Sequence, residues 1–338
     1  MHAIFIWILR FGLIELFSMF FLLVNLLTFT LYLTTNHRHV NNKILFFFTL
    51  ACGGIGAILG MCFSRDKRKS KPFKRITALG LIIALIPVIH IAHALTLDRT
   101  IRYVEIEFRS EHWPTELNGY RIAFMTDMHT IPDEGMQTVA HKLNGRNLDL
   151  LLLGGDFSMH YAHYQGTIRE IAQINATDGI FGVEGNHDNY SRLFAAKEQH
   201  GITPLDNTGT HIREGFYLAG THDMWNRSPN ITEAITGAQA DDFILLLSHN
   251  PDVTMVQSTT DIHLILSGHT HGGQITFFGF PMYLLRGSIT DYGTRFAYGF
   301  ANSADGTPLF ISRGIGPYYI TPRIFARPEV VIFTMYQG

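Results

Sequence analysis

Cysteine is scarce in this chain and is confined to one region. The 338 residues contain two cysteines, Cys52 and Cys62, and both lie within a single apolar run. The polar remainder of the chain therefore has no disulfide option, and it offers no thiolate ligands for a structural zinc site. Internal repeats and low-complexity tracts are also missing, which excludes repeat architectures.

The chain also has no excess of positive charge. Lys and Arg together number 26 and Asp and Glu number 28, which gives a formal net charge of −2. The one dense basic stretch, residues 64–75, is short and lies between two apolar runs. There it is more typical of a membrane-topology signal than of a lipid-headgroup site. We therefore expect no nucleic-acid partner.

Long apolar runs, in contrast, are abundant in the first hundred residues. They cover residues 11–33, 44–63 and 76–95, and each is near the ~20 residues that cross a bilayer core as a helix. We predict three transmembrane helices and a membrane domain over residues 1–97. A buried core helix or a signal peptide is the alternative for the first run alone, but three runs with polar connectors favour a multi-pass membrane protein.

The connectors between the runs predict the orientation. Residues 64–75 hold seven Lys or Arg against one Asp, whereas residues 34–43 hold two basic residues. Because basic connectors stay in the cytoplasm, everything after Leu95 is expected outside the inner membrane, in the periplasm of a bacterium. Arg99, Arg102 and Arg109 follow the third run and weaken this orientation.

Residues 98–338 read as one α/β domain, because strand-like and helix-like segments alternate. The strand candidates are residues 101–108, 121–126, 148–154, 179–183, 216–220, 243–249, 262–268, 308–313 and 329–335. The helix candidates are residues 134–145, 167–176, 190–200 and 231–241. Residues 278–300 show no clear period and are expected to form either a functional loop or a strand hairpin.

Polar side chains gather where five of the predicted strands end. These residues are Asp127 and His129, then Asp156, then the run Gly185-Asn186-His187-Asp188, then His249, and finally the run Gly268-His269-Thr270-His271. Because ligands bind beyond the carboxyl ends of strands in α/β sheets, we expect one site. The turn Gly220-Thr221-His222-Asp223 imitates the third group but lacks its Asn, so we leave His222 outside the ligand set.

This residue set suits two divalent metal ions. Mn²⁺, Zn²⁺ and Fe²⁺ accept mixed oxygen and imidazole ligands, and a pair of such ions can acidify a shared water and clamp a phosphoryl group. One carboxylate must bridge the ions, and Asp156 is our candidate. The Asp-x-His and His-x-His spacings would place both side chains on one face of an extended strand, because strand side chains alternate.

In this order, the motifs resemble those of the calcineurin-like metallophosphoesterases, from about Gly119 to the C-terminus. Residues 268–274, 312–316 and 322–330 are similar to the membrane-associated YkuE/YaeI-like branch. The resemblance implies a four-layer αββα sandwich in residues 98–338. It also implies one ion on Asp127, His129, Asp156 and His271, and a second on Asp156, Asn186, His249 and His269. His187 would stabilise charge at the phosphate, with Asp188 orienting its ring.

The function expected from this resemblance is a membrane-anchored phosphohydrolase. It would use two divalent ions, Mn²⁺ first and Zn²⁺ or Fe²⁺ as alternatives, to cleave a phosphodiester or pyrophosphate bond through a metal-bridging hydroxide. The expected substrate is a phospholipid or another lipid-linked phosphate. A UDP-2,3-diacylglucosamine pyrophosphatase of lipid A synthesis, similar to LpxG, is the narrower alternative. A catalytically silent membrane scaffold is the alternative from another class, and the oligomeric state is not predicted.

Overall fold

The computed structural model describes residues 23–30, 49, 54–63, 71–129, 131–157, 161–189, 191, 195, 199–281, 289–316 and 323–338. The chain divides into two compact units, Met1–Ala92 and His93–Gly338.

Helices make up the described part of the first unit. Helix α3 covers Gly54–Phe63, and helix α5 covers Lys71–Leu95, so that its last residues belong to the second unit. Apolar side chains of α5 are exposed, among them Ile82 at 60% and Leu85 at 54%, whereas a core helix would bury them. Within the described residues, one helical segment, Lys74–Arg99, is long and apolar enough to cross a membrane.

The three predicted spans therefore have different outcomes. The predicted span 76–95 lies inside this apolar helix. The predicted spans 11–33 and 44–63 lie partly outside the described residues, which include only 23–30, 49 and 54–63 of them. Three transmembrane helices thus stay a prediction, with one supported by the structure.

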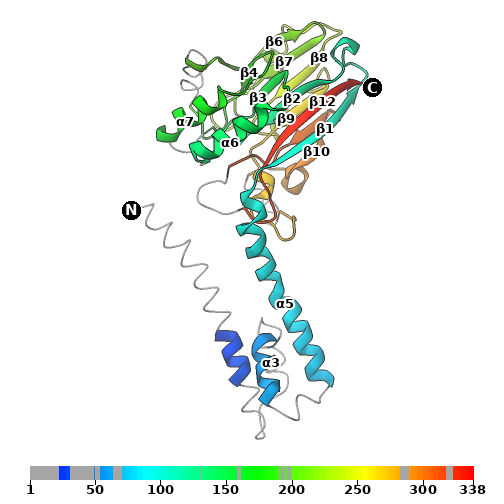
Figure 1. Ribbon diagram of the computed structural model, residues 1–338. Coiled ribbons are helices and arrows are strands. Elements are labelled where there is room, and N and C mark those ends of the chain that lie inside the picture. Colours follow the sequence, from blue (N-terminus) through cyan, green and yellow to red (C-terminus); the bar gives the residue numbers. More distant parts are fainter. Residues whose placement is uncertain are drawn as a thin grey trace. The chain divides into compact units, whose positions relative to one another are not determined.

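The second unit contains two six-stranded mixed sheets (Figure 1). The first sheet has the order β1 (Arg102–Ser110), β12 (Glu329–Gln337), β2 (Tyr120–Met125), β3 (Leu150–Leu153), β4 (Ile180–Gly182) and β5 (Ile202–Pro204). The second has the order β10 (Gly299–Asn302), β11 (Pro308–Ile311), β9 (Leu264–Ser267), β8 (Phe243–Leu247), β7 (Phe216–Gly220) and β6 (Thr208–Arg213).

Strands with parallel neighbours dominate the centre of both sheets. Strands β2 to β5 run parallel to one another, and so do β7, β8, β9 and β11. Antiparallel pairing occurs between β12 and β2, between β10 and β11, and between β6 and β7. The carboxyl ends of the parallel strands in each sheet therefore lie along one edge.

Alternation of side chains along the strands builds three apolar layers. Along β2, Ala123 and Met125 pack toward helices α6 (Asp133–Asn144) and α7 (Tyr161–Ile171), whereas Ile122 and Phe124 face the second sheet. The outer face of the second sheet packs on the short helices α9 (Ile231–Ala234) and α10 (Val253–Val256). The described residues thus form an α/β fold of two facing sheets with α6 and α7 on one side (Figure 1).

Some predicted segments were wrong in extent. The predicted helix 231–241 ends at Ala234, before Thr236 and Gly237, which are poor helix formers. The predicted helix 167–176 begins earlier, at Tyr161, and ends at Ile171, and the predicted helix 190–200 lies mostly outside the described residues. Strands β5, β6 and β10 were not predicted. Within 278–300 the structure describes a short 3₁₀ helix, η6 (Gly293–Phe296), and the start of β10, while 282–288 lie outside it.

Candidate metal centre

Both sheets deliver polar side chains to the edge where their parallel strands end. Asp127 and His129 follow β2, Asp156 follows β3 and Asn186 follows β4, all in the first sheet; His249 follows β8, and His269 and His271 follow β9, in the second. Several hydrogen bonds fasten the loops of one sheet to those of the other. His249 Nδ1 lies 2.7 Å from the Gly154 carbonyl oxygen, and the His269 N–H donates to Asp127 Oδ2 at 3.0 Å.

The backbone of these loops differs from the extended geometry that the spacing suggested. Five of the predicted ligands have positive φ angles, which non-glycine residues seldom adopt; they are Asp127 (52°), His129 (44°), Asp156 (56°), His269 (72°) and His271 (53°). The side chains therefore converge because left-handed turns redirect them, not because strand residues alternate. Such strain clusters at functional sites, where surrounding contacts hold it.

Close backbone approach requires glycine at two of these turns. A Cβ atom on Gly185 would collide with the Asp156 carboxylate and backbone N, and one on Gly268 would collide with the Thr126 hydroxyl and the Asp127 carboxylate. The glycines that precede Asn186 and His269 thus make room for the carboxylates.

The first group of side chains consists of Asp127, His129 and His271. The Nε2 atoms of the two histidines lie 3.0 Å apart, and Asp127 Oδ1 lies 3.3 Å from His271 Nε2 and 3.8 Å from His129 Nε2. Thr126 and the His269 N–H occupy the other oxygen, Oδ2. Oδ1 is buried and accepts no hydrogen bond from any described residue, as expected of an oxygen that faces a cation.

The second group consists of Asn186, His249 and His269. Asn186 Oδ1 lies 2.9 Å from His269 Nδ1 and 3.1 Å from His249 Nε2, and these two nitrogens are 3.2 Å apart. Carbonyl oxygens of Gly154 and Ile289 face the other nitrogens, His249 Nδ1 and His269 Nε2. Because a carbonyl only accepts, those nitrogens carry the protons. In the neutral rings, three electron-pair acceptors therefore meet with no proton between them, which is the arrangement that binds a metal ion.

Asp156 lies between the two groups. Its Oδ2 atom is 3.3 Å from His129 Nε2 and 3.4 Å from His249 Nε2, while Oδ1 accepts the His187 N–H at 2.9 Å. Atoms of Asp127, Asp156 and His249 also lie within 4.8 Å of one another. Asp156 thus lies close to side chains of both groups, and Asp127 is near the same position.

Burial keeps most of the imidazoles neutral, as metal ligation requires. Desolvation lowers the pKa of His129 to about 4 and that of His269 to about 3, and it lowers the pKa of His271 well below its usual value. For His249, burial lowers the pKa, but the nearby carboxylates of Asp156, Asp127 and Asp223 together raise it well above its usual value. Burial opposes ionisation of Asp156, but His249 and His129 hold the pKa of that carboxyl below its usual range.

His187 and Asp188 follow Asn186 in the loop after β4. His187 is half-buried, and its ring centroid lies 5.5 Å from that of His129. The expected role of Asp188 in orienting the His187 ring stays a prediction, and the contacts described for Asp188 are with the backbone. Its carboxylate accepts backbone N–H groups from Asp156 at 2.6 Å, Phe157 at 2.9 Å and Gly185 at 2.9 Å. Asp188 therefore joins the loop after β3 to the loop after β4.

These surroundings also affect the pKa of the Asp188 carboxyl. Burial and the charge of Asp156 raise the pKa of Asp188 to about 8, against the opposing effect of the Gly185 and Phe157 N–H groups. A divalent ion on Asp156 would remove the second cause and favour the carboxylate.

Three residues at the centre were missed in the sequence. Buried Arg323 donates to the His271 carbonyl oxygen at 3.2 Å, and its Nη2 lies 3.3 Å from His271 Nδ1. The Asn226 amide donates to the Asn186 carbonyl oxygen at 2.7 Å, and the Trp225 ring lies edge-on to the His269 ring with centroids 4.6 Å apart. The signal for Trp225 and Asn226 was the turn at 220–223, because Asp223 accepts both of their N–H groups.

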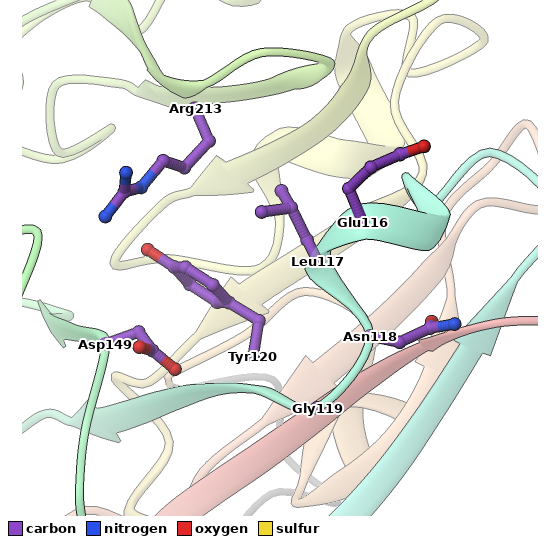
Figure 2. A pocket seen from close by; sticks show the side chains of 7 residues that line it. All are labelled: Glu116, Leu117, Asn118, Gly119, Tyr120, Asp149 and Arg213. Atoms are coloured by element: carbon purple, nitrogen blue, oxygen red, sulfur yellow. The ribbon is translucent and has the colours of Figure 1, made fainter.

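His222 lies in a turn similar to the Gly-Asn-His-Asp turn, but its described contacts lie outside the metal centre. It contacts Asp206, and its N–H donates to Asn207 Oδ1 at 3.0 Å. A separate pocket lies at the amino end of β2, whereas the predicted ligands Asp127 and His129 follow the carboxyl end of that strand; Figure 2 shows the pocket lining. Its lining includes Tyr120 and Arg213, which both bond to Asp178.

Comparison with known proteins agrees with this geometry. Residues 120–273 match the calcineurin-like phosphoesterase family. Metallophosphoesterase YkuE of Bacillus subtilis is 28% identical over 255 residues, covering 70% of this chain and 85% of that protein. A metallophosphoesterase of Campylobacter jejuni is 26% identical over 305 residues, covering 86% of this chain and 78% of that protein.

A third relative is named a transmembrane protein with metallophosphoesterase domain. This protein of Danio rerio is 26% identical over 320 residues, covering 87% of this chain and 71% of its own length. The fold, the paired Asp/His groups and these matches together show that the chain contains a calcineurin-like metallophosphoesterase domain. The chain is a phosphoesterase hydrolase whose fold implies divalent metal ions.

Proposed function

We propose that this chain is a membrane-anchored phosphohydrolase that uses two divalent ions to cleave a phosphodiester or pyrophosphate bond in a lipid-linked substrate. The observation that carries the proposal is the convergence of Asn186 Oδ1, His249 Nε2 and His269 Nδ1 within 3.2 Å of one another. When both rings are neutral, these three atoms are all acceptors, and they repel one another unless they share a cation. A second group beside them, Asp127, His129 and His271, suits another ion.

The ligand residues divide between the two positions as the family resemblance implies. Asp127, His129 and His271 would hold one ion; Asn186, His249 and His269 would hold the other; Asp156 would contact both. Bound divalent ions supply Lewis acidity toward the phosphoryl oxygens and a reactive nucleophile from water. Mn²⁺ is our first choice because the donors are oxygens and imidazoles without thiolate, and Zn²⁺ and Fe²⁺ fit the same donors.

Two features of His187 support a role for it at the phosphate. Its backbone N–H is bound to Asp156 Oδ1, which fixes the residue beside the bridging carboxylate, and its side chain is half-exposed. A protonated imidazole there would stabilise the negative charge of the transition state or protonate the leaving oxygen.

Membrane anchoring is supported by the apolar segment Lys74–Arg99, which leads directly into the phosphoesterase domain. Because the basic connector 64–75 is expected in the cytoplasm, we place the domain on the outer side of the inner membrane. A substrate embedded in the membrane would then reach the enzyme at the membrane surface.

The two alternatives differ from this proposal in testable ways. A UDP-2,3-diacylglucosamine pyrophosphatase would need its domain in the cytoplasm, where nucleotide-linked substrates are made. A silent scaffold would tolerate loss of ligands, yet all seven predicted ligand side chains are present.

Hydrolysis of bis(4-nitrophenyl) phosphate by the purified full-length protein tests the proposal. We expect activity that is lost with a chelator, returns with Mn²⁺ and falls at least about 100-fold in Asn186→Ala. The control is Asn175→Ala, which removes an exposed amide outside the metal centre and should leave the rate unchanged. Equal rates in the two variants, or activity that survives chelation, would reject the proposal.

A further inference from the structure

Four exposed apolar side chains follow the last predicted metal ligand closely along the chain. They are Ile275 (42% exposed), Phe277 (50%), Phe278 (49%) and Phe280 (50%), and we call them the aromatic surface. Phe277 and Phe280 exchange backbone hydrogen bonds of 2.9 and 3.0 Å, and the Gly279 N–H donates to Thr276 Oγ1 at 2.9 Å. The turn is thus held in shape while it presents apolar groups outward, which indicates an interaction surface.

Ring contacts connect the aromatic surface to the end of the apolar helix. The Phe278 ring centroid lies 5.2 Å from that of Phe325, and the Phe325 ring stacks on His93 with centroids 3.9 Å apart. His93 lies in the last turn of α5. The buried Asp98 carboxylate accepts both the His93 Nδ1–H and the Phe325 N–H at 2.8 Å. These contacts fix the aromatic surface next to the residues where α5 ends.

Basic and apolar residues of the same segment suit a membrane interface. Leu95 and Leu97 are 55% and 48% exposed, and Arg99 is exposed beside them. The Arg327 guanidinium donates to the Thr100 carbonyl oxygen at 2.9 Å, which places a second cation there. Aromatic rings and arginines together are typical of the headgroup region, where one part of the side chain is apolar and anionic lipids attract the other.

We propose that the aromatic surface lies in the headgroup layer of the membrane that contains α5. The inference rests on the membrane anchoring in the proposed function. The surface begins four residues after His271, and hydrogen bonds link it to that ligand: the Thr276 N–H donates to the Ile324 carbonyl oxygen at 2.9 Å, and the adjacent Arg323 donates to the His271 carbonyl oxygen at 3.2 Å. The edge where the metal ligands gather therefore faces the lipid, and the substrate class is a lipid whose phosphate is hydrolysed at headgroup depth without leaving the bilayer.

Fluorescence quenching at defined membrane depth tests this placement. The full-length protein with Cys52→Ser and Cys62→Ser would carry Phe278→Cys labelled with an NBD fluorophore, in nanodiscs of phosphatidylcholine and phosphatidylglycerol. The control is Glu116→Cys, because Glu116 is exposed and precedes β2, whereas the metal ligands follow that strand. Nitroxide lipids labelled near the headgroup should quench position 278 at least about 3-fold more strongly than position 116.

Equal quenching at positions 278 and 116, with emission typical of water at both, would overturn the proposal. Phe280→Cys gives a second labelled position that must agree, in case the first variant does not reconstitute. Hydrolysis of bis(4-nitrophenyl) phosphate by the unlabelled protein in the same nanodiscs separates the two proposals. Strong quenching without hydrolysis would contradict the proposed function and support the placement of the aromatic surface in the headgroup layer. Hydrolysis without quenching would contradict that placement alone.

Discussion

Asp188 contacts the backbone of the loops that carry the predicted ligands Asp156 and Asn186. Its two carboxylate oxygens accept three N–H groups from Asp156, Phe157 and Gly185. In Asp188→Asn, the amide group turns a donor toward at least one of these donors, which costs about 1–3 kcal/mol. We expect the melting temperature of the chelated protein, measured by circular dichroism above the Asp188 pKa of about 8, to fall by several degrees, and the Mn²⁺-loaded protein to lose activity.

His187→Gln is the companion variant to Asp188→Asn. Because the His187 side chain is half-exposed and its backbone makes the contact with Asp156, stability should stay within about 0.5 kcal/mol of wild type. Its kcat should nevertheless fall about 10²-fold or more. If His187→Gln destabilised the protein as much as Asp188→Asn, the separate roles assigned to these neighbours would be wrong.

At the residue level, the sequence indicated which side chains lie together better than it indicated the backbone geometry that brings them together. Asp, Asn and His at the ends of apolar strands are visible in sequence because the strands are nearly uniform apolar runs, such as Leu150–Leu153. The positive φ angles of Asp127 and His269 are not visible, since neither residue type requires them. Arg323 was missed because its contact with His271 joins positions 52 residues apart.

A histidine away from the metal centre, His263, is expected to make the stability of the folded chain depend on pH. The His263 Nδ1 atom accepts the Ile244 N–H at 3.0 Å at the start of β8, and its ring lies 4.2 Å from that of His112. Burial and the nearby His112 lower the pKa of His263 to about 4, against a smaller opposing effect of Asp261. Between pH 6.5 and about 4, the folded chain therefore binds fewer protons than the unfolded chain.

This difference in bound protons predicts that the folded chain becomes less stable as the pH falls. The stabilisation from neutral His263 is present above pH 6.5 and is lost as the pH falls through 6.5 toward about 4. His263→Gln offers a neutral acceptor that does not titrate, so its melting temperature should fall less steeply over this interval. Thermal unfolding of the chelated proteins at several pH values checks this, and parallel curves for wild type and variant would contradict it.

At the element level, long apolar strands and the amphipathic helix α6 could be predicted, but short elements could not. β5 has three residues, and β6 reads Thr-Gly-Thr-His-Ile-Arg with mostly exposed side chains, so neither shows a periodic apolar pattern. Their pairing with β4 and β7 makes them strands. The helix predicted over 231–241 followed local propensity, yet the chain turns after Ala234.

For the whole molecule, the side of the membrane decides which substrates the enzyme meets. Glu214 is exposed in the turn between β6 and β7, so Glu214→Cys in a Cys52→Ser and Cys62→Ser background gives one accessible thiol in the phosphoesterase domain. We expect a membrane-impermeant maleimide to label it in cells whose outer permeability barrier is opened while the inner membrane stays intact. Labelling only after the inner membrane is broken would place the domain in the cytoplasm and favour the nucleotide-linked pyrophosphatase.

The central claim is that this chain hydrolyses phosphoester bonds with two metal ions joined by Asp156. Titration of the chelated full-length protein with Mn²⁺, following bound metal and hydrolysis of bis(4-nitrophenyl) phosphate together, tests it most directly. The account predicts that hydrolysis saturates at about two ions per chain. In Asp156→Asn both quantities should fall, whereas Asp261→Asn, which changes an exposed carboxylate, should match wild type. Full hydrolysis with no bound metal, or equal metal binding and activity in Asp156→Asn, would contradict it.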